Sequence, residues 1–252
     1  MTAGGPVIRR RGGLLRWSSV HSPYILEITV ETIDAALAAQ RGGAHRIELC
    51  SDLAQGGLTP GADLMQAARE QIRLPIFAMI RPRGGDFVYS SGEFEAMQRE
   101  IKAASQLGMD GVVLGILKAD GHVDIERTRQ LVDLARPLPV TFHRAFDVSA
   151  DLQQSLEDVI HAGATRILTS GGAATAPEGL DSLAELLDAA RGRIIIIPGS
   201  GISTLNISHV ARRTHAREFH SGLSSVVPSS NKDMDRFEAE VGKLAEQLAS
   251  SE

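Results

Sequence analysis

A helical pattern that stops at a small or polar residue and leads into a short apolar strand recurs four times along this chain of 252 residues. The copies occupy residues 35–50, 101–115, 156–170 and 209–222, and the last copy is the weakest. Glycine closes the helical part of the first three copies, as expected for a residue that adopts the left-handed conformation freely. The repeat therefore predicts a series of helix–strand units.

Strands of a second kind lie between these copies, at residues 24–30, 75–80, 139–142 and 194–198. Both kinds together give eight strands separated by helical patterns, near residues 25, 47, 77, 113, 141, 168, 195 and 219. Eight alternating units in a chain of this length predict an α/β fold, the (β/α)8 TIM barrel. An open doubly wound sheet is the alternative. The paired repeat favours the barrel, because four two-unit modules return on themselves.

The chain shows no shift in composition that marks a domain boundary, so we expect a single barrel domain over residues 23–252. Residues 1–22 contain Arg9, Arg10, Arg11 and Arg16 and no acidic residue, and we interpret them as a flexible basic N-terminal arm. A targeting leader is the alternative, because such leaders are rich in arginine and poor in acids. Further along, residues 90–93 match a capping box and predict the start of a helix.

Composition excludes several classes of partner. The net charge is -5 and aromatic residues make up 4% of the chain, which argues against nucleic-acid binding. No apolar run approaches the ~20 residues of a membrane-spanning helix. Cys50 is the single cysteine, so no disulfide framework within the chain and no paired-cysteine metal or redox motif is possible. We therefore expect a cytoplasmic protein without a nucleic-acid or membrane partner.

Charged residues fall on the side of the strands that faces the barrel interior. Side chains alternate between the two faces of a strand. This alternation turns Glu27, Glu48, Arg81, His143 and His220 inward, with Glu218 on the same face as His220. Barrel interiors are usually filled with branched aliphatic residues, and charged residues are rarely buried unless they are paired. A structural ion-pair network is one explanation. A binding site is the favoured one, because barrel sites lie at the carboxyl ends of strands.

The segments after the strands support a site for an anion. Arginine side chains and glycine-rich turns follow several strands, and many barrels hold phosphate after strands seven and eight. We expect Glu48 and His143 to act as general acid or base on a small phosphate- or carboxylate-bearing substrate. The residues expected to bind that substrate are Glu27, Arg81, Arg83, Arg144, Asp147, Ser170, Gly171, Gly199, Ser200, Gly201 and His220.

Four ordered segments also carry a family resemblance. Residues 47–60, 79–87, 142–147 and 167–171 make the chain similar to the CutC copper-homeostasis family over about residues 24–225. The resemblance implies a cytoplasmic (β/α)8 barrel that is associated with copper tolerance and copper(I) binding and that forms homodimers or homotetramers. It implies no particular enzymatic reaction.

The copper role rests on few soft ligands in this chain. Copper(I) prefers cysteine and methionine, with histidine as an acceptable third ligand. Some relatives carry cysteine where this chain has Thr29 or Val88, which leaves Cys50 as the candidate metal ligand, helped by Met79 and by His143 or His220. Cys50 also fits a small buried apolar residue. Three hypotheses stay open: a copper(I)-binding protein, a barrel enzyme with a small anionic substrate, and a purely structural protein.

Overall fold

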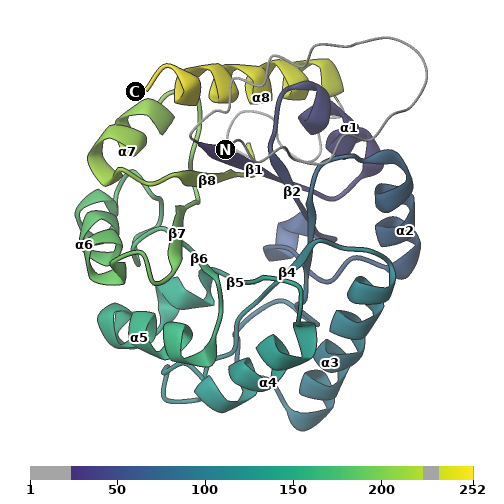
Figure 1. Cartoon of the computed structure of the whole chain (residues 1–252), viewed down its shortest axis with the longest axis vertical. Coiled ribbons are helices and arrows are strands. Elements are labelled where there is room, and N and C mark those ends of the chain that lie inside the picture. The colour runs from purple at the N-terminus through teal and green to yellow at the C-terminus, as the bar shows by residue number, and fades with distance from the viewer. Residues whose placement is uncertain (1–23, 224–232, 252) are drawn as a thin grey trace, which may run out of the picture.

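A computed structural model describes residues 24–223 and 233–251, in which eight strands alternate with eight α-helices around a ring (Figure 1). The strands are β1 (Ile25–Val30), β2 (Arg46–Leu49), β3 (Ile76–Met79), β4 (Gly111–Leu114), β5 (Val140–Phe142), β6 (Arg166–Thr169), β7 (Ile195–Pro198) and β8 (Glu218–Ser221). The helices are α1 (Ile33–Arg41), α2 (Ala62–Gln71), α3 (Ser91–Gln106), α4 (Ile125–Ala135), α5 (Leu152–Ala162), α6 (Leu180–Ala190), α7 (Ile207–Thr214) and α8 (Met234–Ala249). Two short 3₁₀ helices, η1 (Leu53–Gln55) and η2 (Arg144–Val148), follow β2 and β5.

All paired strands are parallel, and their order is β7-β6-β5-β4-β3-β2-β1-β8. The two ends of this order, β7 and β8, lie side by side and complete the ring, with the helices outside it (Figure 1). The (β/α)8 barrel is therefore confirmed, and the open doubly wound sheet is wrong. The predicted basic arm, residues 1–22, lies outside the described residues.

The barrel wall separates two apolar clusters. A large cluster fills the space between strands and helices and contains Leu26 and Ile28 from β1. A small cluster lies inside the barrel and consists of Cys50, Phe77, Met79 and Val113, with Leu53 packed against it. The predicted alternation of inward and outward side chains is thus confirmed. Because the inner cluster is small, much of the barrel interior is left to polar side chains.

The ends of the helices follow the local sequence. The side chains of Ser90 and Glu93 form the predicted capping box at the start of α3. Gly163 ends α5 with a φ of 90°, a left-handed conformation that glycine adopts without a steric penalty. In the weakest copy of the repeat His215 takes the equivalent position after α7, with a φ of 55°. None of the helices in the described part of the chain has the length and apolarity that crossing a bilayer requires.

Candidate functional site

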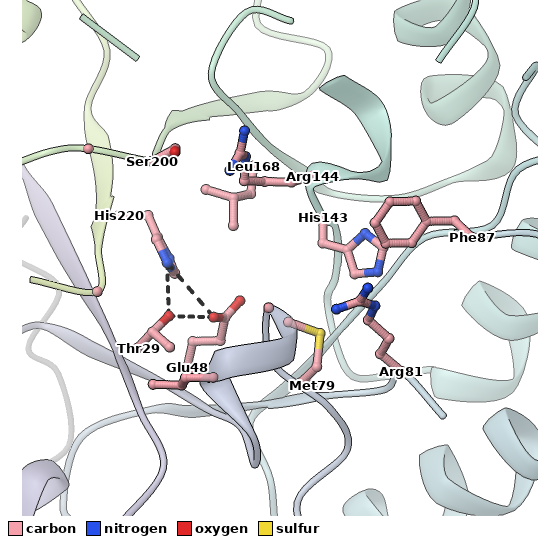
Figure 2. A pocket seen from close by; sticks show the side chains of 14 residues that line it. Thr29, Glu48, Met79, Arg81, Phe87, His143, Arg144, Leu168, Ser200 and His220 are labelled. Atoms are coloured by element: carbon pink, nitrogen blue, oxygen red, sulfur yellow. Dashed lines mark hydrogen bonds and ion pairs between the residues drawn. The ribbon is translucent and has the colours of Figure 1, made fainter. Parts of the chain in front are cut away.

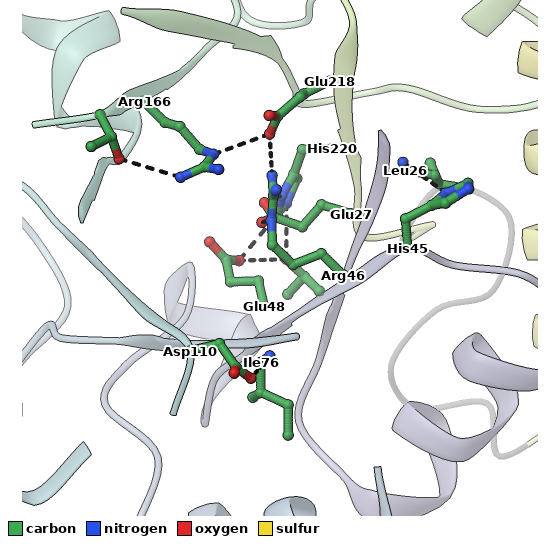
Figure 3. A network of polar contacts seen from close by, with 12 residues as sticks. Leu26, Glu27, His45, Arg46, Glu48, Ile76, Asp110, Arg166, Glu218 and His220 are labelled. Atoms are coloured by element: carbon green, nitrogen blue, oxygen red, sulfur yellow. Dashed lines mark hydrogen bonds and ion pairs between the residues drawn. The ribbon is translucent and has the colours of Figure 1, made fainter. Parts of the chain in front are cut away.

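An ion-pair network joins residues near the amino-terminal ends of four strands (Figure 3). Arg46 bonds to Glu27 through Nε and to Glu218 through Nη2, the latter at 2.6 Å. Glu218 also accepts from Nε of Arg166 at 3.2 Å, and both guanidinium groups lie over the ring of Phe77. All of these charges are paired, which is the condition for keeping them in a barrel interior. The network forms a polar floor beneath the site.

Strand register places a second polar layer above this floor. Glu27 pairs with His220 of β8, and Thr29 pairs with Glu48 of β2. Their side chains form a chain of contacts. Glu27 Oε1 lies 2.7 Å from His220 Nδ1 (Figure 3), and His220 Nε2 lies 2.8 Å from Thr29 Oγ1 (Figure 2). The Thr29 hydroxyl in turn donates to Glu48 Oε2 at 2.5 Å. Two carboxylates are thus linked through an imidazole and a hydroxyl.

Burial and neighbouring charges together shift the pKa values of the ionisable groups in this layer. Although burial favours the neutral acid, Arg46 and His220 lower the pKa of Glu27 to about 2. Burial raises the pKa of Glu48, while the charge of His220 opposes that shift. Burial disfavours the imidazolium of His220, yet Glu48 and Glu27 raise its pKa. Glu27 is therefore a permanent anion, and Glu48 is the carboxyl group of the pair that takes up a proton more readily.

A cavity of about 260 Å³ opens above this layer at the carboxyl ends of the strands (Figure 2). This volume suits a small molecule. Its wall combines cationic, hydroxyl, apolar and glycine residues: Thr29, Glu48, Leu53, Gly56, Met79, Arg81, Phe87, His143, Arg144, Leu168, Ser200, Gly201, His220 and Gly222.

Arg81 is a buried cation with no carboxylate partner among the described residues. Its side chain is 5% exposed, and its terminal nitrogens donate to the backbone carbonyls of Gln55, Gly57 and Gly85 at 2.8, 3.2 and 3.1 Å. Its Nε has no hydrogen-bond partner in the described structure, although it is buried. Buried arginines normally face a carboxylate. Arg81 therefore brings an uncompensated positive charge to the cavity wall.

His143 faces the cavity as a neutral hydrogen-bond donor. Its Nδ1 accepts from the backbone amide of Ala145 at 3.1 Å, so the ring proton lies on Nε2. Burial and the charge of Arg81 lower the pKa of His143 to about 3, and Nε2 has no partner among the described atoms. The ring packs 4.9 Å from that of Phe87. An imidazole in this state can stabilise a developing negative charge on a bound oxygen.

The loop after β6 is organised by Asp147. Its carboxylate accepts from the hydroxyl of Thr169, from the backbone amides of Ser170 and Gly172, and from Nε of Arg144 at 2.8 Å. Arg144 also donates to Ser170 Oγ at 3.1 Å, and its side chain is 41% exposed. Asp147 therefore holds the loop, while Arg144 reaches the cavity as a second, more accessible cation.

The structure places some of the predicted site residues in the wall of the cavity and others outside it. Seven of the predicted residues line the cavity: Glu48, Arg81, His143, Arg144, Ser200, Gly201 and His220. The others lie outside its lining: Glu27, Cys50, Arg83, Asp147, Ser170, Gly171 and Gly199. Glu27 lies beneath the cavity, where Arg46 and His220 hold it. Arg83 turns away to pair with Glu93 and Asp86. The site roles predicted for these seven residues stay predictions.

Some lining residues were not among those predicted. Thr29 shares the inward face of β1 with Glu27, so the alternation already contained the signal for it. Arg46 shares the face of Glu48 in the same way and belongs to the floor. Phe87 and Leu168 enter the wall from a loop and from β6, and their position depends on packing that no local pattern encodes.

Glu27, Glu48 and His220 form a buried group that is compatible with a metal ion, because their ligand atoms lie within 4.8 Å of one another. Cys50 adjoins this group, with Sγ 3.6 Å from Glu48 Oε2. Burial and Glu48 raise the pKa of Cys50 well above its ordinary value, so its sulfur is a thiol at neutral pH. Oxygen and nitrogen atoms thus dominate the donor set.

The chain is similar to one family along most of its described length. The model of the CutC family matches residues 24–225. A "family protein CutC" of Chromobacterium violaceum is 49% identical over 206 residues, which cover 82% of this chain and 83% of the relative. A "copper homeostasis protein cutC homolog" of Mus musculus is 46% identical over 209 residues, which cover 83% of this chain and 77% of the relative.

Solved structures agree with this similarity. The putative copper homeostasis protein CutC of Streptococcus agalactiae superposes with a TM-score of 0.75 at 32% identity, covering 79% of this chain and 98% of that one. A thiamine phosphate pyrophosphorylase of Pyrococcus furiosus superposes with a TM-score of 0.61 at 14% identity, covering 91% and 98% of the two chains. The second likeness concerns the fold alone.

Proposed function

The chain belongs to the CutC family, and we propose that it serves copper homeostasis by binding a small anionic molecule at the mouth of its barrel. Copper homeostasis is the role in the names of the mouse and human relatives, which are 46% and 44% identical to this chain. The anionic ligand is the function that the geometry of the cavity supports best.

The buried guanidinium group of Arg81 carries this proposal. A charge taken out of water costs several kcal/mol unless an opposite charge compensates it. In the described structure the hydrogen-bond acceptors of Arg81 are backbone carbonyls, and its guanidinium lies over the Phe87 ring and beside the Tyr89 hydroxyl, with no carboxylate partner. Its Nε has no hydrogen-bond partner there. A phosphate or carboxylate group in the cavity would supply the missing negative charge. Arg144 on the same wall adds a second positive charge.

The neighbouring groups support acid–base chemistry on such a ligand. His143 Nε2 is a donor without a partner, and Glu48 Oε1 is a carboxyl oxygen without one in the described structure. Burial raises the pKa of Glu48, which brings its proton affinity closer to what catalysis at neutral pH requires. We propose that Glu48 exchanges a proton with the ligand while His143 and Arg81 bind an oxygen that becomes more negative.

Copper(I) binding at Cys50 is the second candidate. Cys50 and Met79 lie in one cluster inside the barrel, and both carry sulfur. Copper(I) binding requires Cys50 to lose its proton, which burial and Glu48 oppose. Met79 is the one sulfur-bearing residue of the described cavity lining. The donors present do not fit a thiolate copper(I) site, and we therefore rank this candidate second.

The proposal also includes the location of the protein and its assembly. We infer a cytoplasmic location and a homodimeric or homotetrameric assembly from the resemblance to the CutC family. The expected partners are the small anionic ligand and, in the second candidate, a copper ion.

Calorimetry with a panel of sugar phosphates and dicarboxylates tests the anion site. Arg81→Met should weaken binding roughly ten- to hundredfold, because a charge-assisted contact is worth about 1.5–3 kcal/mol. Arg83→Met is the matched control, since Arg83 pairs with Glu93 and Asp86 outside the cavity. Arg144→Met removes the more accessible cation. This variant provides a second test of the anion site in case Arg81→Met fails to fold. Failure of every panel member to bind, or equal losses in the Arg81 and Arg83 variants, would contradict the anion site.

Growth on elevated copper tests the physiological role. A copper-sensitive strain that lacks its own family member should regain tolerance with the wild-type chain and with Cys50→Ser, but not with Arg81→Met. Tolerance that depends on Cys50 and not on Arg81 would favour the copper(I) candidate instead.

A further inference from the structure

A hydroxyl oxygen, a carboxylate oxygen and an imidazole nitrogen form one triangular face at the bottom of the cavity (Figure 2). Thr29 Oγ1 lies 2.5 Å from Glu48 Oε2 and 2.8 Å from His220 Nε2, and the latter two atoms are 3.8 Å apart. Two ligand atoms that each lie about 2.1 Å from one ion are at most about 4.2 Å apart, so all three separations allow one shared ion. We propose that Thr29, Glu48 and His220 bind a divalent cation such as Mn²⁺ or Zn²⁺.

Glu27 prepares His220 for this role. Its Oε1 lies 2.7 Å from His220 Nδ1, while its Oε2 is held by Arg46. A carboxylate that accepts the Nδ1 proton fixes the ring and directs Nε2 toward a metal, as in carboxylate–histidine–metal triads. The ion takes the place of the Nε2 proton that faces Thr29 Oγ1. Glu27 is fully buried and ionised by its neighbours, so it does not turn away to solvent. The second layer of a metal site is thus already present.

The carboxylate of Glu48 provides the independent sign of a ligand. Glu48 is 3% exposed, lines the cavity, and has an Oε1 without a partner in the described structure. A buried acceptor without a partner costs free energy that a bound group would offset. Coordination by both carboxylate oxygens of Glu48 would give Oε1 this partner.

The donors select against copper(I). Carboxylate, hydroxyl and imidazole groups suit Mn²⁺, Fe²⁺ and Zn²⁺, whereas copper(I) requires thiolate or thioether ligands. Cys50 is the nearest thiol, with Sγ 3.6 Å from Glu48 Oε2, and it is the only cysteine in the chain. The cation site therefore differs from the soft site that the family name suggests.

The test uses metal ions alone on protein freed of metal with a chelator, at pH 8 so that protons compete less for the imidazole. Mn²⁺ binding is followed by electron paramagnetic resonance and Zn²⁺ binding by calorimetry. We expect one tight equivalent in the wild type and at least about a tenfold loss of affinity in Glu48→Gln and in Thr29→Val. Thr29→Val is nearly isosteric, so it keeps the test valid if Glu48→Gln fails to fold.

Two variants outside the cavity serve as controls. Thr141→Val removes a buried hydroxyl that has no partner among the described residues, and Glu100→Gln changes a half-buried carboxyl that accepts from Thr59. Both should bind the ions like the wild type. No stoichiometric binding, or equal binding by Glu48→Gln and Thr29→Val, would overturn the proposal, as would displacement of the ion by copper(I) that depends on Cys50. Because no organic ligand is present, none of these results bears on the anion site.

Discussion

His143 and Arg81 pack against the same aromatic ring, that of Phe87, each about 4.9 Å from its centroid. The contact places a buried imidazole next to a buried positive charge. Burial and this charge together lower the pKa of His143 to about 3. The cavity thereby keeps a neutral imidazole beside a cation across the physiological pH range.

This pKa predicts how stability depends on pH. The folded-state pKa lies below the ordinary value of 6.5, so the unfolded chain binds the proton more readily. The stability contributed by neutral His143 is complete above pH 6.5 and is lost as the pH falls toward 3. Between pH 6.5 and 5 the loss amounts to about 2 kcal/mol. His143→Asn keeps an acceptor for the Ala145 amide and should lose less stability over this range in denaturant unfolding experiments. Equal pH dependence in both proteins would contradict the shift.

The close packing of His143 predicts a steric effect of Gly115→Ala. A Cβ atom at Gly115 would lie 2.5 Å from His143 Nδ1 and 3.0 Å from Ala145 Cβ. Because the ring is confined by Phe87, we expect a destabilisation of about 1–3 kcal/mol and a shifted His143 signal in NMR spectra. Gly92→Ala is the control, since a Cβ there meets nothing within 4 Å and lies in α3. It should stabilise slightly, and a larger loss there than at Gly115 would refute this packing.

The ionic floor predicts a large effect of Arg46→Met. Removal of this guanidinium leaves the carboxylate of Glu27 with His220 alone and that of Glu218 with Arg166 alone. We expect a loss of about 3–5 kcal/mol in unfolding free energy, the usual result of breaking a buried pair. Arg41→Met removes an exposed pair with Glu238 and should cost about 1 kcal/mol or less. Similar losses in both variants would show that water reaches the ion pairs of the floor and screens their charges.

The state of Cys50 predicts that folding is independent of copper. Its thiol is protonated at neutral pH because burial and Glu48 raise its pKa, and no closed set of soft ligands surrounds it in the described structure. Thermal melts with and without a copper(I) chelator should nearly coincide, and the single thiol should react slowly with a disulfide reagent. A fall in Tm of about ten degrees or more, which corresponds to about 2.5–5 kcal/mol for a chain of this size, would contradict this.

Local patterns predicted the fold well, because they act over short distances. The structure contains the predicted glycine at the end of α5 and the predicted alternation of inward and outward side chains along β1 and β2. The inward direction of Glu27 was predictable, but its depth was not. Depth depends on register, which pairs Glu27 with His220 and Thr29 with Glu48. Glu27 then lies beneath the cavity, whereas the other three residues line it.

Loop arginines could not be assigned from the sequence for a similar reason. Arg81 and Arg83 are two residues apart, yet one lines the cavity and the other pairs with Glu93 at the surface. The choice depends on which partners the loops bring near. The backbone carbonyls of Gln55 and Gly57 accept hydrogen bonds from Arg81, whereas Glu93 in the first turn of α3 accepts one from Arg83.

The anion site can be examined in a crystal structure of the protein purified without added ligand, with diffraction also recorded at the copper absorption edge. We expect electron density for a small anion within hydrogen-bonding distance of Arg81 Nε and His143 Nε2, and no anomalous signal at Cys50. An anomalous copper peak bonded to Cys50 Sγ, with only water beside Arg81, would contradict this expectation.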